Sequence, residues 1–182
     1  LFAEDFFLHA VLEDIGNADT YFKIGLLRRS RERHAPAAAY LVRSLAIQPW
    51  PDSGAMAYHE LGVSLVEMGK PMEGLAVWTE GLAKYPATGS ILWDALAVWR
   101  FDLGESLEAA VATRAAVQTF AERAARMNEI YRKCFDRLGE DDRRLLRARE
   151  ADLPGELDRR QAEAGRARQE GRAWLTPEGR AA

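Results

Sequence analysis

Two stretches of the sequence contain residue types that could do chemistry. His59 and Glu60 begin like a zinc-binding helix, but Val63 stands where the second histidine of that motif is needed. The stretch Gly62–Lys70 has the glycines and the lysine of a phosphate-binding loop. However, its glycines are seven residues apart, and Pro71 follows the lysine where Ser or Thr is required. Neither motif is complete, so we predict neither activity.

The other reactive side chains also lack a catalytic or metal-binding arrangement. His9, His34 and His59 fall in three separate segments with no cysteine or carboxylate spacing to unite them, so we expect histidines on a surface or in a groove. The single cysteine, Cys134, cannot form an internal disulfide. We therefore predict that this chain is not an enzyme and that it holds no cofactor and no metal ion.

The composition is that of an ordinary folded chain. The 182 residues are 48% hydrophobic with a net charge of −3, and the apolar runs are shorter than the ~18 residues that a membrane-spanning helix needs. Residues 121–182 contain 15 basic and 13 acidic residues of interleaved sign, which is typical of a solvated helix face. We expect no membrane span and no nucleic-acid partner.

Two further features bear on the origin of the chain. The excess of Arg over Lys, 21 to 4, together with abundant Ala, favours a GC-rich, bacterial coding sequence. No secretory signal is visible at the start, so we expect a soluble, cytoplasmic protein.

The elements that position these residues are predicted to be helical hairpins. From Ala55 to Pro86, large and small residues recur at helical spacing on both sides of a break at Gly69–Pro71. The marker residues of the first helix are Tyr58, Leu61, Gly62 and Leu65, and those of the second are Gly74, Trp78, Gly81 and Pro86. Equivalent first-helix markers stand at Tyr21, Ile24 and Gly25, and again at Trp93, Leu96 and Ala97.

This pattern resembles the tetratricopeptide repeat (TPR), a pair of antiparallel helices of about 34 residues. The resemblance implies an all-α fold, a right-handed α-solenoid of antiparallel helix hairpins. It divides the chain into a half repeat at 1–17, repeats at 18–51, 55–88 and 90–123, a degenerate repeat or cap at 124–153, and a charged, solvated terminal helix with a disordered tail at 155–182. The half repeat suggests that the chain begins inside a larger protein.

Some positions depart from the family pattern. Arg28 and Arg100 occupy a slot that is usually apolar, and Thr113 replaces an aromatic residue. Moving the register by one would put Trp99 in the slot of Arg100, so two alignments of residues 89–101 stay open. The residues from Pro51 to Gly54 are expected to lengthen the connection between the first two repeats.

In this family, one side of each first helix lines a concave groove that binds a peptide or a helix of a partner. Most residues on that side are apolar here, and the predicted peptide-binding residues are Phe22, Leu26, Met56, His59, Val63, Ile91, Asp94 and Val98. Two interpretations are open: the groove binds an apolar partner, or a tight superhelix buries these residues against neighbouring repeats. The Lys, Asn and Arg residues with which chaperone-binding members clamp a C-terminal carboxylate are missing.

The leading hypothesis is a non-catalytic scaffold that holds a partner protein or peptide in this groove. The alternative is that the chain is the accessory repeat region of a larger enzyme, such as a bacterial glycosyltransferase, whose catalytic domain lies outside it. Neither the partner's identity nor the oligomeric state can be deduced from these residues.

Overall fold

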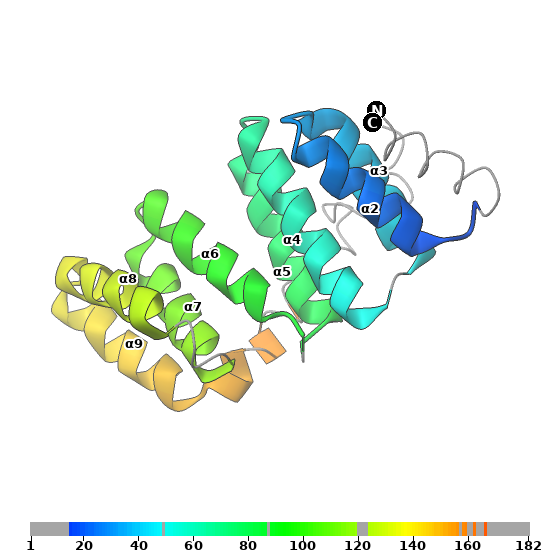
Figure 1. The fold of residues 1–182 in the computed structure, drawn as a ribbon. Helices are drawn as coiled ribbons and strands as arrows, with labels where there is room; N and C mark the ends of the chain where they lie inside the picture. The colour runs from blue at the N-terminus through cyan, green and yellow to red at the C-terminus, as the bar shows by residue number, and fades with distance from the viewer. Residues whose placement is uncertain are drawn as a thin grey trace. The chain divides into compact units, whose positions relative to one another are not determined.

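A computed structural model describes residues 15–166, except 49, 87, 120–123, 157, 160–161 and 163–165. The described residues form helices and no strand (Figure 1). The helices are α2 (Ala18–Arg29), α3 (His34–Ile47), α4 (Pro51–Glu67), α5 (Pro71–Lys84), α6 (Ser90–Asp102), α7 (Ser106–Thr119), α8 (Ala124–Arg137) and α9 (Glu140–Ala151). The predicted half repeat at 1–17 and most of the predicted tail lie outside the described residues.

The chain divides into two compact units, and the division falls within α5. The described part of unit 1 runs from residue 15 to Val77, and unit 2 runs from Trp78 to Arg166. No helix among the described residues is both long and apolar enough to cross a membrane.

Three helix pairs are joined by turns of the same geometry. The backbone N–H groups of Arg33, Lys70 and Glu105 each donate to the carbonyl five residues earlier, at 3.0, 2.9 and 2.8 Å. The residue before each donor has a positive φ, at Glu32 (58°), Gly69 (77°) and Gly104 (81°). This arrangement is the 6→1 hydrogen bond that closes a helix C-terminus over a left-handed residue. The α8–α9 connection differs, because Gly139 has a φ of −71° and precedes α9 in an extended conformation.

Unit 1 packs α2 against α3 and α3 against α4, and α2 also contacts α4 (Figure 1). The predicted marker residues form its core: Ile24, Leu41, Tyr58 and Leu61 have no exposed surface. Gly25 lets α3 approach α2, since a methyl group there would lie 2.7 Å from the Leu41 Cγ. Helix spacing in this unit is therefore set by residues with little side chain.

The start of α4 corrects one prediction. The residues from Pro51 to Gly54 were expected to lengthen a connection, whereas they form the first turn of α4. Pro51 favours this because proline fits the first helical position, where its missing N–H has no intrahelical acceptor. The Gly54 N–H already donates to the Trp50 carbonyl at 2.7 Å. The extra residues therefore extend a helix and not a loop.

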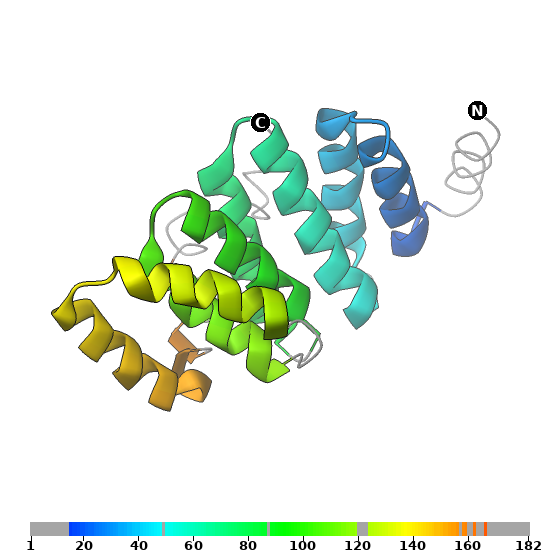
Figure 2. The same ribbon diagram turned by 60° about the vertical axis from the view of Figure 1, so that its left-hand side comes forward.

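Unit 2 is organised around α7, which packs against α6, α8 and α9 (Figure 2). The buried side of α7 is formed largely by small residues: Ala109, Ala110, Ala112, Ala115 and Ala116. Thr113, which replaces an aromatic residue of the repeat pattern, is also fully buried and donates its hydroxyl to the Ala110 carbonyl at 2.6 Å. The hydroxyl is thus satisfied within the helix, and neighbouring helices can approach closely.

Helix α8 is linked to its neighbours by arginine–aromatic contacts. Arg114 of α7 lies 3.8 Å from the Tyr131 ring centroid, and Arg143 of α9 lies 4.6 Å from that of Phe135. Two residues after Phe135, Arg137 of α8 lies 4.4 Å from the ring centroid of Phe101 in α6. A guanidinium over an aromatic face within ~6 Å is attracted by the ring quadrupole. These contacts supplement a small apolar core in which α8 buries Met127 and Cys134.

The contact between α4 and α5 in unit 1 can be tested with Gly74→Ala. A methyl group at this position would lie 2.9 Å from the Gly62 carbonyl oxygen, so the two helices must separate. We expect a loss of ~1–3 kcal/mol in the free energy of unfolding, measured by urea denaturation. The comparison change Gly139→Ala, at the N-cap of α9 and with no atom within 4 Å, should cost at most ~0.5–1 kcal/mol through weaker capping, without a steric clash. Equal losses in the two variants would show that close packing at Gly74 is not the cause.

Candidate functional site

Five of the eight predicted peptide-binding residues lie on the neighbouring helices α2 and α4 of unit 1. All five are half-buried, namely Phe22, Leu26, Met56, His59 and Val63. In contrast, the hairpin positions of the same two helices are at most 9% exposed: Tyr21, Ile24, Tyr58, Leu61 and Leu65. The two helices therefore have one face committed to the hairpin core and a second, partly accessible face.

An ion pair connects the two helices beside this face. Arg29 at the end of α2 pairs with Glu60 of α4, whose side chain is only 8% exposed. The His59 Nδ1 lies 3.3 Å from the other oxygen of the same carboxylate. Because a buried carboxylate needs a charged partner, Arg29 both neutralises Glu60 and ties α2 to α4.

The remaining predicted residues, Ile91, Asp94 and Val98, lie on α6 of unit 2 and are also half-buried. The eight residues therefore belong to two compact units, with five on the first and three on the second. That all eight form one concave strip stays a prediction.

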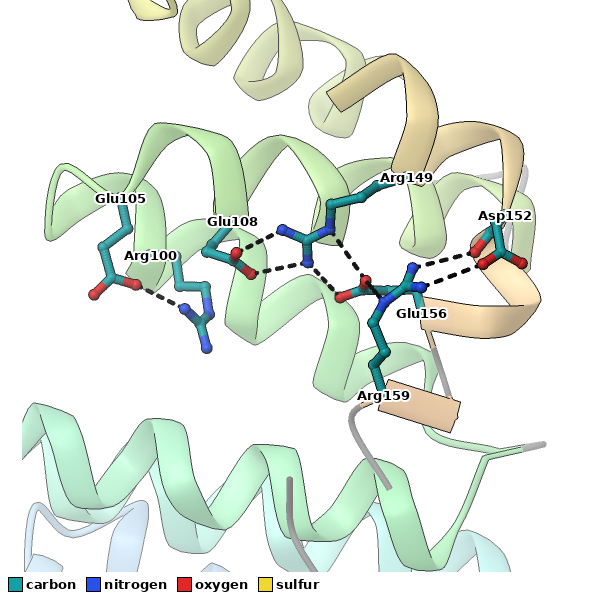
Figure 3. Close-up of polar contacts among 7 residues, drawn as sticks. All are labelled: Arg100, Glu105, Glu108, Arg149, Asp152, Glu156 and Arg159. Carbon is teal, nitrogen blue, oxygen red and sulfur yellow. Dashed lines mark hydrogen bonds and ion pairs between the residues drawn. The ribbon is translucent and has the colours of Figure 1, made fainter. Parts of the chain in front are cut away.

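A second candidate site, which sequence reasoning missed, is a charged pocket of unit 2 with a volume of about 570 Å³ (Figure 3). It is lined by Arg100, Glu105, Glu108, Arg149, Glu156, Arg159, Ala162 and Arg166. The charged side chains come from α6, the α6–α7 turn, α7, α9 and the helical segment after α9. The pocket therefore gathers side chains of both signs from distant parts of the sequence.

Most of these side chains form one chain of alternating charge. Arg149 donates from Nη1 and Nη2 to the carboxylate of Glu108, at 2.6 and 3.2 Å, and from Nη2 and Nε to that of Glu156, at 2.7 and 3.2 Å. Arg159 then joins Glu156 to Asp152, at 3.1 and 3.2 Å. Figure 3 shows Arg149 between its two carboxylates. Both acceptors are bound in the bidentate manner that makes arginine–carboxylate contacts strong and directional.

The protonation of Arg149 follows from these contacts. Burial lowers the pKa of its guanidinium, but the hydrogen bonds and negative charges of Glu108 and Glu156 outweigh burial and raise that pKa above its ordinary value. A permanently charged guanidinium is a poor general acid or base, because catalysis at neutral pH needs a group that titrates near it. The arrangement suits charge recognition and structural fixation, not proton transfer.

Helix α6 supplies a further arginine to the pocket. The Arg100 Nη1 donates to Glu105 at 2.7 Å, and the Arg100 side chain is 13% exposed. This explains how an arginine can fill a slot that is usually apolar: its aliphatic stem is buried, while its charged end is paired.

The segment after α9 differs from the prediction of a solvated helix. Glu156 is 1% exposed and Leu153 is 9% exposed, so the start of this segment is docked on unit 2. The prediction was wrong at Glu156, because the partners of this residue cannot be seen in a charge-rich stretch. Arg149, which binds Glu156, lies seven residues before it. Glu108, the other carboxylate bound by Arg149, lies 41 residues before Arg149. The other described residues from 158 onward are exposed: Asp158, Arg159, Ala162 and Arg166.

Comparison with known proteins does not identify the site. Neither the known protein families nor the curated proteins include a match to this chain. Within the part of the chain that the structure describes, no group of three His, Cys, Asp or Glu side chains could hold a metal ion.

The burial of Cys134 gives a test of packing in unit 2. The residue has no exposed surface, and burial raises the pKa of its thiol to about 11. At pH 8 the native thiolate fraction is then ~0.1%, compared with about a quarter for an ordinary thiol. We expect native Cys134 to react with a disulfide reagent at least ~100-fold more slowly than in urea.

A matched control places the thiol on the exposed side of the same helix. In a variant with Ala125→Cys and Cys134→Ala, the new thiol should react at nearly the same rate with and without urea, because Ala125 is exposed. Rapid labelling of native Cys134 would contradict the packing of α8 against its neighbours.

Proposed function

We propose that this chain is a non-catalytic TPR-like scaffold, a right-handed α-solenoid that binds an amphipathic helix of a partner protein. The binding residues lie on the second, partly accessible face of the first helix of each hairpin, that is, of α2, α4 and α6. On α2 and α4 this face comprises Phe22, Leu26, Met56, His59 and Val63. The corresponding residues of α6 form the same kind of face on unit 2.

The repeated turn supports the assignment to helical repeats. Three helix pairs end their first helix with the same hydrogen bond over a left-handed residue, at positions 32, 69 and 104. The intervals of 37 and 35 residues between these positions are close to the repeat length of about 34. A recurring local geometry at a nearly constant interval is expected of a repeat architecture.

The observation on which the binding proposal rests is the distribution of exposure on α2 and α4. A helix that served only its hairpin would need a single apolar face, yet these helices have a second face on which four of the five residues are apolar and partly exposed. The two helices also contact one another, and the Arg29–Glu60 ion pair joins them. Partly accessible apolar residues on neighbouring helices are typical of a protein-binding surface.

The chemistry of this face selects the kind of partner. The charge of Glu60 is neutralised by Arg29, so fixed charge contributes little to the contact. Met56 and Val63 can pack against the apolar side of a partner helix without precisely matched polar contacts. Binding should therefore depend weakly on salt and strongly on buried apolar area.

The proposal can be tested with a displayed library of amphipathic helical peptides, selected against the full chain. Selected peptides should bind through unit 1, and Val63→Glu should weaken the best of them by ~2 kcal/mol, about thirtyfold in Kd, in a fluorescence anisotropy titration. The fold should survive, because Val63 lies outside the hairpin core, and circular dichroism checks this.

Ala39→Glu is the matched control, since it adds the same charge to an exposed position of α3 in the same unit. It should leave peptide affinity unchanged. If Val63→Glu unfolds the chain while Ala39→Glu does not, the face is internal packing and the proposal fails. If every selected peptide binds both variants equally, recognition uses another surface.

A further inference from the structure

The described contacts of the segment after α9 with the rest of unit 2 are made mainly by charged side chains. Among the described residues from Asp152 to Arg159, Leu153 is the one buried apolar residue. The carboxylate of Glu156 is almost fully buried and accepts hydrogen bonds from both Arg149 and Arg159 (Figure 3). Attachment of this kind depends on charge pairing more than on apolar burial, so it can be exchanged for an equivalent pairing with another molecule.

Arg149 is a preorganised receptor for a carboxylate. Glu108 holds one edge of its guanidinium from α7, which fixes the direction of the other edge. That other edge, formed by Nε and Nη2, is filled by Glu156 of the same chain. A donor pair whose position is already fixed binds a carboxylate without further loss of side-chain freedom.

The local conformation of the segment directs Glu156 to this edge. The Asp152 carboxylate accepts from the backbone N–H of Gly155 at 3.1 Å and from Arg159 at 3.2 Å. Gly155 leaves room for the Asp152 carboxylate in this position, because a methyl group there would displace it. The segment therefore curls back toward α9 and presents Glu156 to Arg149.

Opening of the segment would uncover one edge of Arg149. With Glu156 in place, the lining has four arginines and three glutamates. Glu156 and Arg159 leave this lining together when the segment opens, so the edge of Arg149 formed by Nε and Nη2 loses its acceptor. The uncovered edge then favours an acidic ligand with at least one side-chain carboxylate.

We propose that Asp152–Glu156 together with Arg159 form an autoinhibitory strap. Its Glu156 occupies the carboxylate site of Arg149, and an acidic segment of another protein takes that site when the strap opens. This site is distinct from the proposed helix-binding face, because it lies on α7, α9 and the strap. Its failure would leave the scaffold proposal intact.

The test uses Glu156→Gln in the full chain, which keeps the shape of the side chain and removes its charge. The side-chain Nε–H of Arg149, which donates to the Glu156 carboxylate across the contact between α9 and this segment, reports on the strap by NMR hydrogen exchange. We expect its exchange to accelerate about tenfold or more. A fluorescein-labelled hexaglutamate peptide should bind this variant at least ~10-fold more tightly than the unmodified chain.

Asp158→Asn is the matched control, since it removes the same charge from an exposed position of the same segment. It should change neither exchange nor peptide binding, which separates the strap from a general effect of net charge. Adding Arg149→Gln to Glu156→Gln should abolish peptide binding, with the fold checked by circular dichroism. If Glu156→Gln fails to fold, Glu156→Asp, which keeps the charge on a shorter arm, should still accelerate exchange and admit the peptide.

Two results would overturn the proposal. Unchanged exchange in a folded Glu156 variant would show that the carboxylate does not hold the strap. Accelerated exchange with no peptide binding, or with binding that survives Arg149→Gln, would show that the strap does not guard a carboxylate site.

Discussion

Close approach of helix backbones is the constraint on which each unit depends. In unit 1 this approach occurs where Gly25 meets Leu41 and where Gly74 meets the Gly62 carbonyl. In unit 2 the alanines of α7 have the same effect over a longer face. Because helices can pack this closely only over short side chains, the small residues fix the distances, and the large buried residues fill the space that remains.

Much of the fold could be predicted from the sequence because its signals are local. Helical spacing and the Gly69 and Gly104 turns identify helix pairs from residues within one or two turns of each other. The first turn of α4 was missed because Pro and Gly are read as loop residues, while a proline at the first helical position favours a helix. The turn at Glu32 has no glycine, so its left-handed conformation is not signalled by residue type.

The two candidate sites differ in how visible they are in the sequence. The partly exposed face of α2 and α4 follows from helical periodicity, so its residues could be named in advance. The charged pocket could not, because its defining pair joins Arg149 to Glu108 across 41 residues. Interleaved Arg and Glu look the same in sequence whether they face solvent or one another. Only the folded arrangement distinguishes Glu156, which is buried, from Asp158, which is exposed.

The arginine–aromatic contacts of α8 have a thermodynamic consequence. Helices α8 and α9 bury few apolar residues of their own, with Met127 and Cys134 on α8 and Leu146 on α9. The heat-capacity increment of unfolding comes from exposed apolar area and is reduced by exposed polar area. This end of unit 2 should therefore contribute less heat capacity per residue than the aromatic- and leucine-rich core of α6. Its stability then varies less steeply with temperature, and ionic strength becomes the stronger influence on whether α8 and α9 stay in place.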